Sequence, residues 1–222
     1  MPETFIPGSY WTPDRAEAAA ARMTATMNAP EMQALLAAVA ASAADGGDPA
    51  AAAAVAAQAA PPAPPLDGPI DPAAVVVRRG RIGDVPALVQ LIVHGQLPPL
   101  FIEEFVEGFC VAEHRGQLIA CGGNEYYGPE CAVIRSVVAH ERARGLRLGG
   151  RVARLLVEDA RAFGAKDIYL FTMHAADFWR HIGFRDHPLD RWRPEVRVNW
   201  QYIFCSTFPE AARDVKAMWM PA

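Results

Sequence analysis

The sequence predicts an α/β domain, with helices and strands mixed along the chain, behind an N-terminal extension rich in alanine and proline. Three observations predict it. The composition of the 222-residue chain changes sharply near residue 72. A hairpin pattern occupies 109–123, and the segment 130–172 has the pattern of a strand, a helix and a second strand. We therefore place the extension at 1–72 and the folded domain at 73–222.

The extension is expected to be helical in part. Thr12 and Pro13 are typical of a helix start, and an alanine-rich segment follows them as far as Met27. A second helix is expected at about 30–44, and a proline-rich linker at 61–72. Because alanine side chains bury little area, we expect the extension to be loosely attached. The alternative is plain disorder.

The domain opens with a strand and a helix. The segment 75–80 is rich in valine, which favours a strand. Asp84 is expected to cap a helix that has Pro86 in its first turn. A short helix is expected to end at Gly108. The first helix has an apolar side at helical spacing, which consists of Leu88, Leu91 and Ile92.

Alternation of apolar and polar residues then predicts strands. The segment 109–123 is expected to form a hairpin around a turn at 114–117, and 130–139 is the next strand.

The helix that follows is the best defined by its periodicity. Apolar residues recur at helical spacing over 148–163, and Gly164 is placed to end the helix. The segment 167–172 is apolar on both faces, as in a buried parallel strand. The region 130–172 is therefore expected to be one strand–helix–strand unit.

Composition narrows the function classes. The formal charge of −4 argues against nucleic-acid binding, which needs a basic surface. The four cysteines show no metal-ligand spacing, so we expect no metal site and reduced thiols in a cytoplasmic protein. No apolar stretch is long enough to predict a membrane span, and no secretion signal is visible.

The segment 140–159 carries an unusual charge pattern. A helix N-terminus has a partial positive charge, so arginines are disfavoured there unless an anion binds. Exposed N–H groups and guanidinium groups together suit phosphate. The alternative is a solvated basic face paired with acids elsewhere in the chain. The cluster consists of Arg142, Arg144, Arg147, Arg151 and Arg154.

This segment resembles the acetyl-CoA motif of the GNAT acetyltransferase superfamily, whose core Arg/Gln-x-x-Gly-x-Gly/Ala corresponds to 144–149. Arg147 stands where the first signature glycine belongs. Gly183 and Phe184 match the closing Gly-Phe of the family, and the resemblance covers about 75–206. It implies acetyl-CoA as the cofactor, bound in part through strand backbone groups. The implied cofactor-binding residues are Val137, Val138, Ala139, Arg142, Arg144, Gly145, Leu146, Arg147, Leu148, Gly149 and Gly150.

The resemblance also implies a fold and a reaction. The fold is a mixed, mostly antiparallel central sheet with flanking helices and a splayed parallel strand pair. The region from Thr172 to Phe184 and the later Asn199-Trp200-Gln201 are most similar to the amino-acid N-acetyltransferase branch, which includes N-acetylglutamate synthase domains and small relatives linked to arsenic-resistance operons. The implied reaction is direct attack of a small amine, such as an amino acid, on the acetyl thioester. The alternatives are a catalytically silent acetyl-CoA-binding module and a protein N-acetyltransferase.

Two residues are candidate catalytic groups. Glu125 could act as a base through water, with an ordinary turn carboxylate as the alternative. His174 follows a parallel strand, where open α/β sheets place ligands, and its alternative is an exposed loop histidine. Trp179 stands where many family members carry a tyrosine as general acid. Cys121 and Cys131 would permit a covalent acyl route, but no histidine partner is evident beside them.

The acceptor site is expected to involve three further residues. Trp179 could shape the substrate pocket. Asn199 and Gln201 are expected to alternate along a strand, share one face and hold a substrate carboxylate, with a polar sheet edge as the alternative. The expected partners are a small-molecule amine and, in a homodimer, a second copy of the chain.

Overall fold

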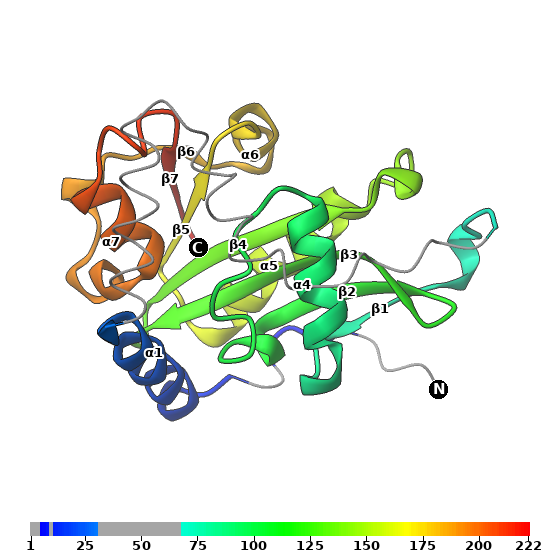
Figure 1. Ribbon diagram of the computed structural model, residues 1–222, viewed down its shortest axis with the longest axis horizontal. Coiled ribbons are helices and arrows are strands. Elements are labelled where there is room, and N and C mark those ends of the chain that lie inside the picture. The colour runs from blue at the N-terminus through cyan, green and yellow to red at the C-terminus, as the bar shows by residue number, and fades with distance from the viewer. Residues whose placement is uncertain (1–4, 9–10, 31–67) are drawn as a thin grey trace.

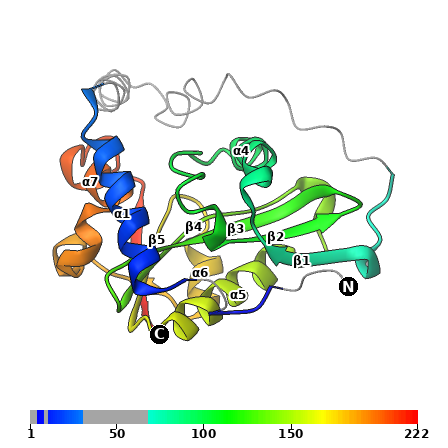
Figure 2. The same cartoon turned by 90° about the horizontal axis from the view of Figure 1, so that it is seen from below.

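The computed structural model describes residues 5–8, 11–30 and 68–222. In this part of the chain a seven-stranded sheet has the order β1-β2-β3-β4-β5-β7-β6, and helices lie on both of its faces (Figures 1 and 2). The strands are β1 Val75–Arg79, β2 Phe109–His114, β3 Gln117–Tyr127, β4 Cys131–Ala139, β5 Asp167–Thr172, β6 Arg185–Asp186 and β7 Lys216–Pro221. The helices are α1 Pro13–Met27, α4 Val85–His94, α5 Leu148–Phe163, α6 Ala176–Ile182 and α7 Trp200–Thr207.

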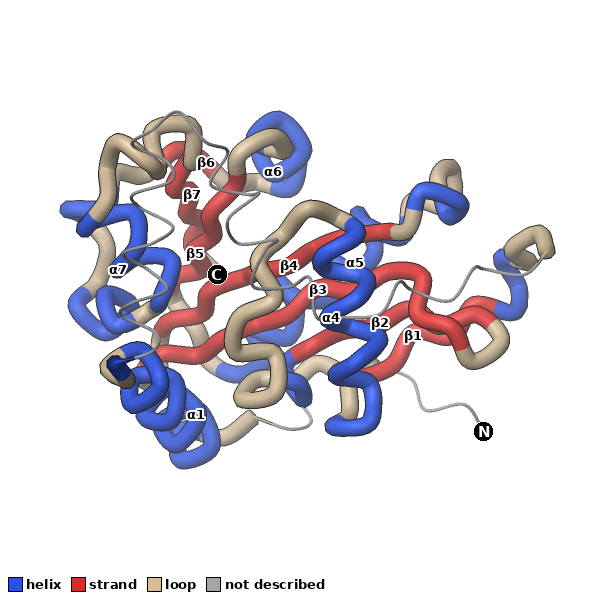
Figure 3. The backbone as a smooth tube through the Cα atoms, viewed as in Figure 1, coloured by secondary structure: helices blue, strands red, loops and turns tan. Residues whose placement is uncertain are grey.

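The central strand pair is splayed. Every neighbouring pair is antiparallel except β4 and β5, which run parallel. Their pairing extends from Cys131 opposite Asp167 to Ile134 opposite Leu170 and then stops. Beyond that point the two strands diverge (Figure 3). The mostly antiparallel sheet and the splayed parallel pair confirm the predicted fold class.

Strand β4 also carries a bulge where it begins to leave β5. Cys121 pairs with Val138 and Gly123 with Arg135, so Gly122 lies opposite two residues of β4. One of them, Ser136, has a φ of 53°. Such bulges bend a strand and re-aim its backbone groups, and they are frequent next to active sites.

Helix α5 covers one face of the sheet and α4 the opposite face (Figure 2). The residues of α5 that face the sheet are buried, among them Val152 and Leu156. Both would meet a Cβ added at Gly122, so this glycine lets the helix approach the sheet closely. Gly164 ends α5 in the left-handed region at φ 108°, as the sequence predicts.

The described residues 5–8 and 11–30 of the extension pack on the sheet, which corrects, for this part, the expectation that the extension is loosely attached. Helix α1 buries Met23 and Met27, and its alanines allow close approach to β3. Before the helix, Trp11 is buried in the same core, and the amide of Phe5 donates to the carbonyl of Val77 at 2.9 Å. Methionine and aromatic side chains supply the apolar area that alanine lacks.

The remaining expectations for the extension lie largely outside the described residues. These include the helix at 30–44 and most of the linker at 61–72. The domain boundary near residue 72 therefore stays a prediction. Within the described ranges, no helix combines the length and the apolar character needed to cross a lipid bilayer.

Two local predictions are wrong. The short helix before Gly108 is only a 3-10 turn over Val106–Gly108. Asn199 and Gln201 do not alternate along a strand, because Asn199 caps helix α7 and Gln201 lies in its first turn. The Asn199 side chain accepts hydrogen bonds from the amides of Gln201 at 2.9 Å and Tyr202 at 3.1 Å. This is the usual capping role of asparagine, and it overrides the strand propensity of the aromatic residues that follow.

Candidate functional site

The N-terminus of α5 forms an open, positively charged end. The first amides of a helix lack partners within the helix, and the first turn of α5 contains no acidic residue. Arg144, Arg147, Arg151 and Arg154 are all exposed there. Among the described residues, none of these four is joined to a carboxylate by an ion pair. The alternative of a basic face paired with acids therefore does not describe this part of the structure.

The shape of this end also suits a phosphate group. A Cβ added at Gly145 or Gly149 would meet no atom within 4 Å. At Gly150 it would meet only the guanidinium group of Arg154, from 3.7 Å. Free amides, a helix dipole and guanidinium groups around open space fit a pyrophosphate. Arg142 differs from the rest of the cluster, since its Nη2 donates to the carbonyl of Gly68 at 2.6 Å.

The backbone conformation at position 147 explains why a glycine suits the position where this chain has Arg147. Arg147 precedes α5 with a φ of 54°, in the left-handed region that glycine adopts freely. The arginine therefore adopts a glycine-like conformation at a steric cost and adds an exposed positive charge. Gly145, at φ 89°, supplies the other left-handed position of the loop.

The C-terminal half of β4 presents backbone groups toward the splay. Val138 and Ala139 pair with β3 on one edge of the strand, whereas the edge facing β5 has no strand partner beyond Ile134 in the described sheet. The bulge at Ser136 and Val137 opens this stretch. Cys121 stabilises it from the neighbouring strand by donating its thiol to the carbonyl of Ser136 at 3.6 Å.

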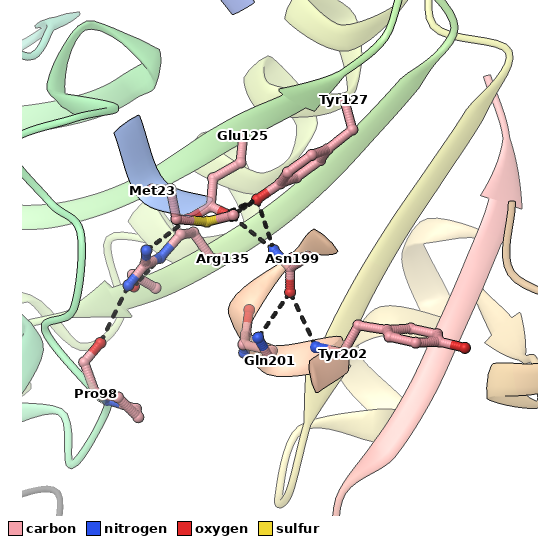
Figure 4. Close-up of polar contacts among 9 residues, drawn as sticks. Met23, Pro98, Glu125, Tyr127, Arg135, Asn199, Gln201 and Tyr202 are labelled. Atoms are coloured by element: carbon pink, nitrogen blue, oxygen red, sulfur yellow. Dashed lines mark hydrogen bonds and ion pairs between the residues drawn. The ribbon is translucent and has the colours of Figure 1, made fainter. Parts of the chain in front are cut away.

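Glu125 belongs to a buried polar network (Figure 4). The structure places it inside β3, two residues before the strand ends, and not at the strand end or in a turn. Its Oε1 forms an ion pair with Nη1 of Arg135 at 2.6 Å. Its Oε2 accepts from the hydroxyl of Tyr127 and from Nδ2 of Asn199, each at 2.7 Å. Burial, and then the charge of Glu125, raise the pKa of Tyr127 well above its usual value.

This network joins five parts of the fold, beginning with β3 and β4, which carry Glu125 and Arg135. The hydroxyl of Tyr127 contacts Sδ of Met23 in α1 at 3.3 Å, and Asn199 brings in α7. Nη2 of Arg135 donates to the carbonyl of Pro98 in the connection after α4. Because both oxygens of Glu125 are engaged and its side chain is fully buried, the geometry favours a counter-ion for Arg135 over a freely accessible base.

The other predicted site residues lie elsewhere. His174 is exposed in the turn between β5 and α6, beyond the C-terminal end of the parallel pair. Trp179 is buried in α6, with its ring 5.3 Å from that of Phe184 and 5.0 Å from that of Phe178. Trp179 thus belongs to the core that fastens α6.

Sequence reasoning missed Arg135 and Trp200. Arg135 is 4% exposed and lies directly before the bulge, and the ring of Trp200 lies 5.4 Å from its guanidinium carbon. The signal for Arg135 was available, since a lone arginine interrupts an otherwise apolar strand pattern. For Trp200, no local pattern shows that it meets β4.

The cysteines are placed for packing. Burial raises the pKa of Cys131 to about 11, and it raises that of Cys121 further. Both thiols are therefore protonated near neutral pH, and the thiolate is the reactive form. This argues against a covalent route through either residue.

Comparison with known proteins agrees with this geometry. The sequence profile described as the acetyltransferase (GNAT) family matches residues 91–184. An uncharacterized N-acetyltransferase of Chlorobaculum tepidum is 29% identical over 127 residues, which cover 52% of this chain and 79% of the relative. An amino-acid acetyltransferase of Mycobacterium tuberculosis is 30% identical over 122 residues, 50% of this chain and 68% of the relative.

Solved structures show the same fold. N-acetylglutamate synthase from Neisseria gonorrhoeae, complexed with coenzyme A and N-acetyl-glutamate, superposes with a TM-score of 0.56 at 19% identity. The match covers 66% of this chain but only 35% of that enzyme. The Mycobacterium tuberculosis protein Rv2747, in complex with CoA and a second ligand, gives a TM-score of 0.55 at 23% identity. That match covers 66% of this chain and 99% of the other.

Proposed function

The chain belongs to the GNAT family of acetyltransferases, and we propose that it transfers the acetyl group of acetyl-CoA to the amine of an amino acid. The observation that carries the proposal is the open end of α5, where exposed arginines without carboxylate partners surround free helix amides. A pyrophosphate is the anion that such an end suits best.

The chain's own groups divide the work of binding. The amides at Gly149 and Gly150 and the guanidinium groups of Arg144 and Arg147 hold the pyrophosphate. The β5-facing edge of β4, over 137–139, hydrogen-bonds the pantetheine arm and polarises the thioester carbonyl. When bound, acetyl-CoA supplies that carbonyl as the group that the amine attacks.

Proton transfer in the proposed reaction requires one base from the protein, and solvent can supply the acid. The amine must lose a proton before it attacks, and His174 is the candidate base because its imidazole is exposed at the end of β5. Trp179 cannot replace a tyrosine as the acid, since an indole N–H does not titrate in water. Solvent therefore protonates the leaving thiolate. We assign Glu125 the role of holding Arg135 beneath the bulge.

An amino acid as acceptor is supported by the relatives. One of them is named an amino-acid acetyltransferase, and a protein of the same fold was crystallised with N-acetyl-glutamate. We therefore expect release of free thiol from acetyl-CoA when the purified chain is mixed with one of the twenty amino acids. A panel in which no amine releases thiol would refute the proposal.

Coenzyme A binding provides a separate test. Arg144→Glu should weaken binding measured by calorimetry at least tenfold and leave the melting temperature nearly unchanged, because the side chain is exposed. Arg161→Glu makes the same charge change at the exposed far end of α5 and is the matched control. Equal affinity of the two variants would show that the loop is not the pyrophosphate site.

A further inference from the structure

The first turn of α7 carries two polar atoms that the fold buries and leaves unpaired. Nε1 of Trp200 and Oε1 of Gln201 have no hydrogen-bond partner among the described residues, and solvent does not reach either atom. Trp200 as a whole is 6% exposed. Buried polar atoms are nearly always paired in folded proteins, so two neighbouring exceptions indicate a missing partner.

The helix turn that carries these atoms is fixed by hydrogen bonds. Asn199 caps the turn through the amides of Gln201 and Tyr202, and its own Nδ2 donates to Glu125. The first turn of α7 is thereby tied to β3, and the ring of Trp200 lies 5.4 Å from the guanidinium carbon of Arg135. The unpaired atoms therefore do not belong to a loose surface loop.

Their position relates them to the reaction. Arg135 directly precedes the bulge of β4, and its Nε donates to Oγ of Ser136 at 3.2 Å. The edge of β4 that follows is the one to which we assign the thioester carbonyl. The first turn of α7 thus meets β4 immediately before the reacting stretch, and it does so through Trp200.

We propose that this turn binds the acceptor amino acid, with Nε1 of Trp200 donating to its carboxylate and Oε1 of Gln201 accepting from its amine. The proposal rests on the proposed function and names the substrate class more closely. An indole N–H can only donate and an amide oxygen can only accept, so the two atoms match a carboxylate and an amine in hydrogen-bonding type.

Binding at this place requires the covering segment to move. The connection after α4 packs there, since the ring of Phe101 lies 6.5 Å from that of Trp200 and the carbonyl of Pro98 accepts from Arg135. Phe101 has a φ of 56° and Gln96 one of 57°, so two residues of this connection hold left-handed conformations that are costly for side chains other than glycine. The acceptor enters as this connection shifts.

The test compares the best amino acid of the panel with its carboxamide, which keeps the amine and loses the carboxylate charge. We expect the chain to prefer the acid by at least tenfold in kcat/KM. Trp200→Phe, which keeps the ring and removes the N–H, should reduce this preference at least fivefold by raising the KM of the acid, with the KM of acetyl-CoA unchanged. Trp192→Phe is the matched control, because that buried indole already donates to the carbonyl of His187.

A second variant gives a test that does not depend on whether Trp200→Phe folds. Gln201→Met keeps the length of the side chain, removes the oxygen and should raise the KM of the acid and of its carboxamide alike, because both carry the amine. An unchanged acid preference in Trp200→Phe, or a wild-type chain that uses the carboxamide equally well, would overturn the inference. In both outcomes acetyl transfer still occurs, so the proposed function would stand. Absence of turnover with every amine would overturn both.

Discussion

Replacing Glu125 with glutamine removes one charge from the buried network and changes its shape very little. In the folded protein the carboxylate lies 2.6 Å from Nη1 of Arg135 and accepts from Tyr127 and Asn199. The side chains of Glu125 and Arg135 are 0% and 1% exposed. The variant therefore leaves a buried guanidinium group without a counter-ion, and the glutamine has only one oxygen for three donors.

The magnitude follows from the burial. Breaking a buried ion pair by removing one partner costs about 3–5 kcal/mol. For a domain of this size, each kcal/mol lowers the melting temperature by about 2–4 °C. The Glu125→Gln variant should therefore melt roughly 6–20 °C below the wild type.

Scanning calorimetry measures this shift, and Glu103→Gln, a substitution at an exposed position, should stay within about 2 °C of the wild type. Adding Arg135→Met should recover part of the loss, because no unpaired charge is then buried. If Glu125→Gln melts within about 2 °C of the wild type, or the double variant is less stable than the single one, the network does not depend on a buried ion pair.

Three further outcomes are expected. Arg147→Gly should raise the melting temperature by about 2–4 °C, because it removes about 1 kcal/mol of left-handed strain, and an unchanged value would refute that strain. His174→Ala should lower kcat about 100-fold with little change in the KM of acetyl-CoA, and an unaltered pH–rate profile would remove it as the base. Burial acts to raise the pKa of Asp84, but the hydrogen bonds and charge of Arg78 outweigh this and lower the pKa below its ordinary 3.8. The resulting stability is present above that pH and lost as the pH falls through the lowered value, so Asp84→Asn should flatten the acid limb of a urea-unfolding series below about pH 4.

The part of the site built from local sequence could be predicted. The bounds of α5 follow from its apolar spacing and from Gly164, and the structure has them at Leu148–Phe163. The arginines around its start are visible in the sequence as charges of a sign that is unfavourable there, and the anion site that they indicate stays a proposal. Even the left-handed conformation of Arg147 could have been inferred from the glycine that the family motif carries there.

The part built from distant segments could not be predicted in the same way. Periodicity shows that Met23 lies on a helix, but it does not show that this helix packs on β3 and contacts Tyr127. An asparagine at position 199 is compatible with a strand and with a helix cap. The four residues that follow it decide which of the two forms. Glu125 could be interpreted as a base or a turn carboxylate because its partner Arg135 lies on the neighbouring strand, where it pairs with Gly123, and no local pattern joins the two side chains.

The two halves of the proposed site should respond differently to substitution. The proposed cofactor half comes from one continuous segment, 136–150, whose charged side chains are exposed, so charge changes there should alter binding with little effect on stability, except at the left-handed Arg147. The proposed acceptor half joins residues from α1, β3, β4 and α7 through buried polar bonds, so most substitutions there should change stability as well. Trp200 and Gln201 are exceptions within that half, because the two atoms in question have no partner to lose. A loss of acceptor affinity at these two positions, without loss of stability, therefore distinguishes a recognition site from a structural contact.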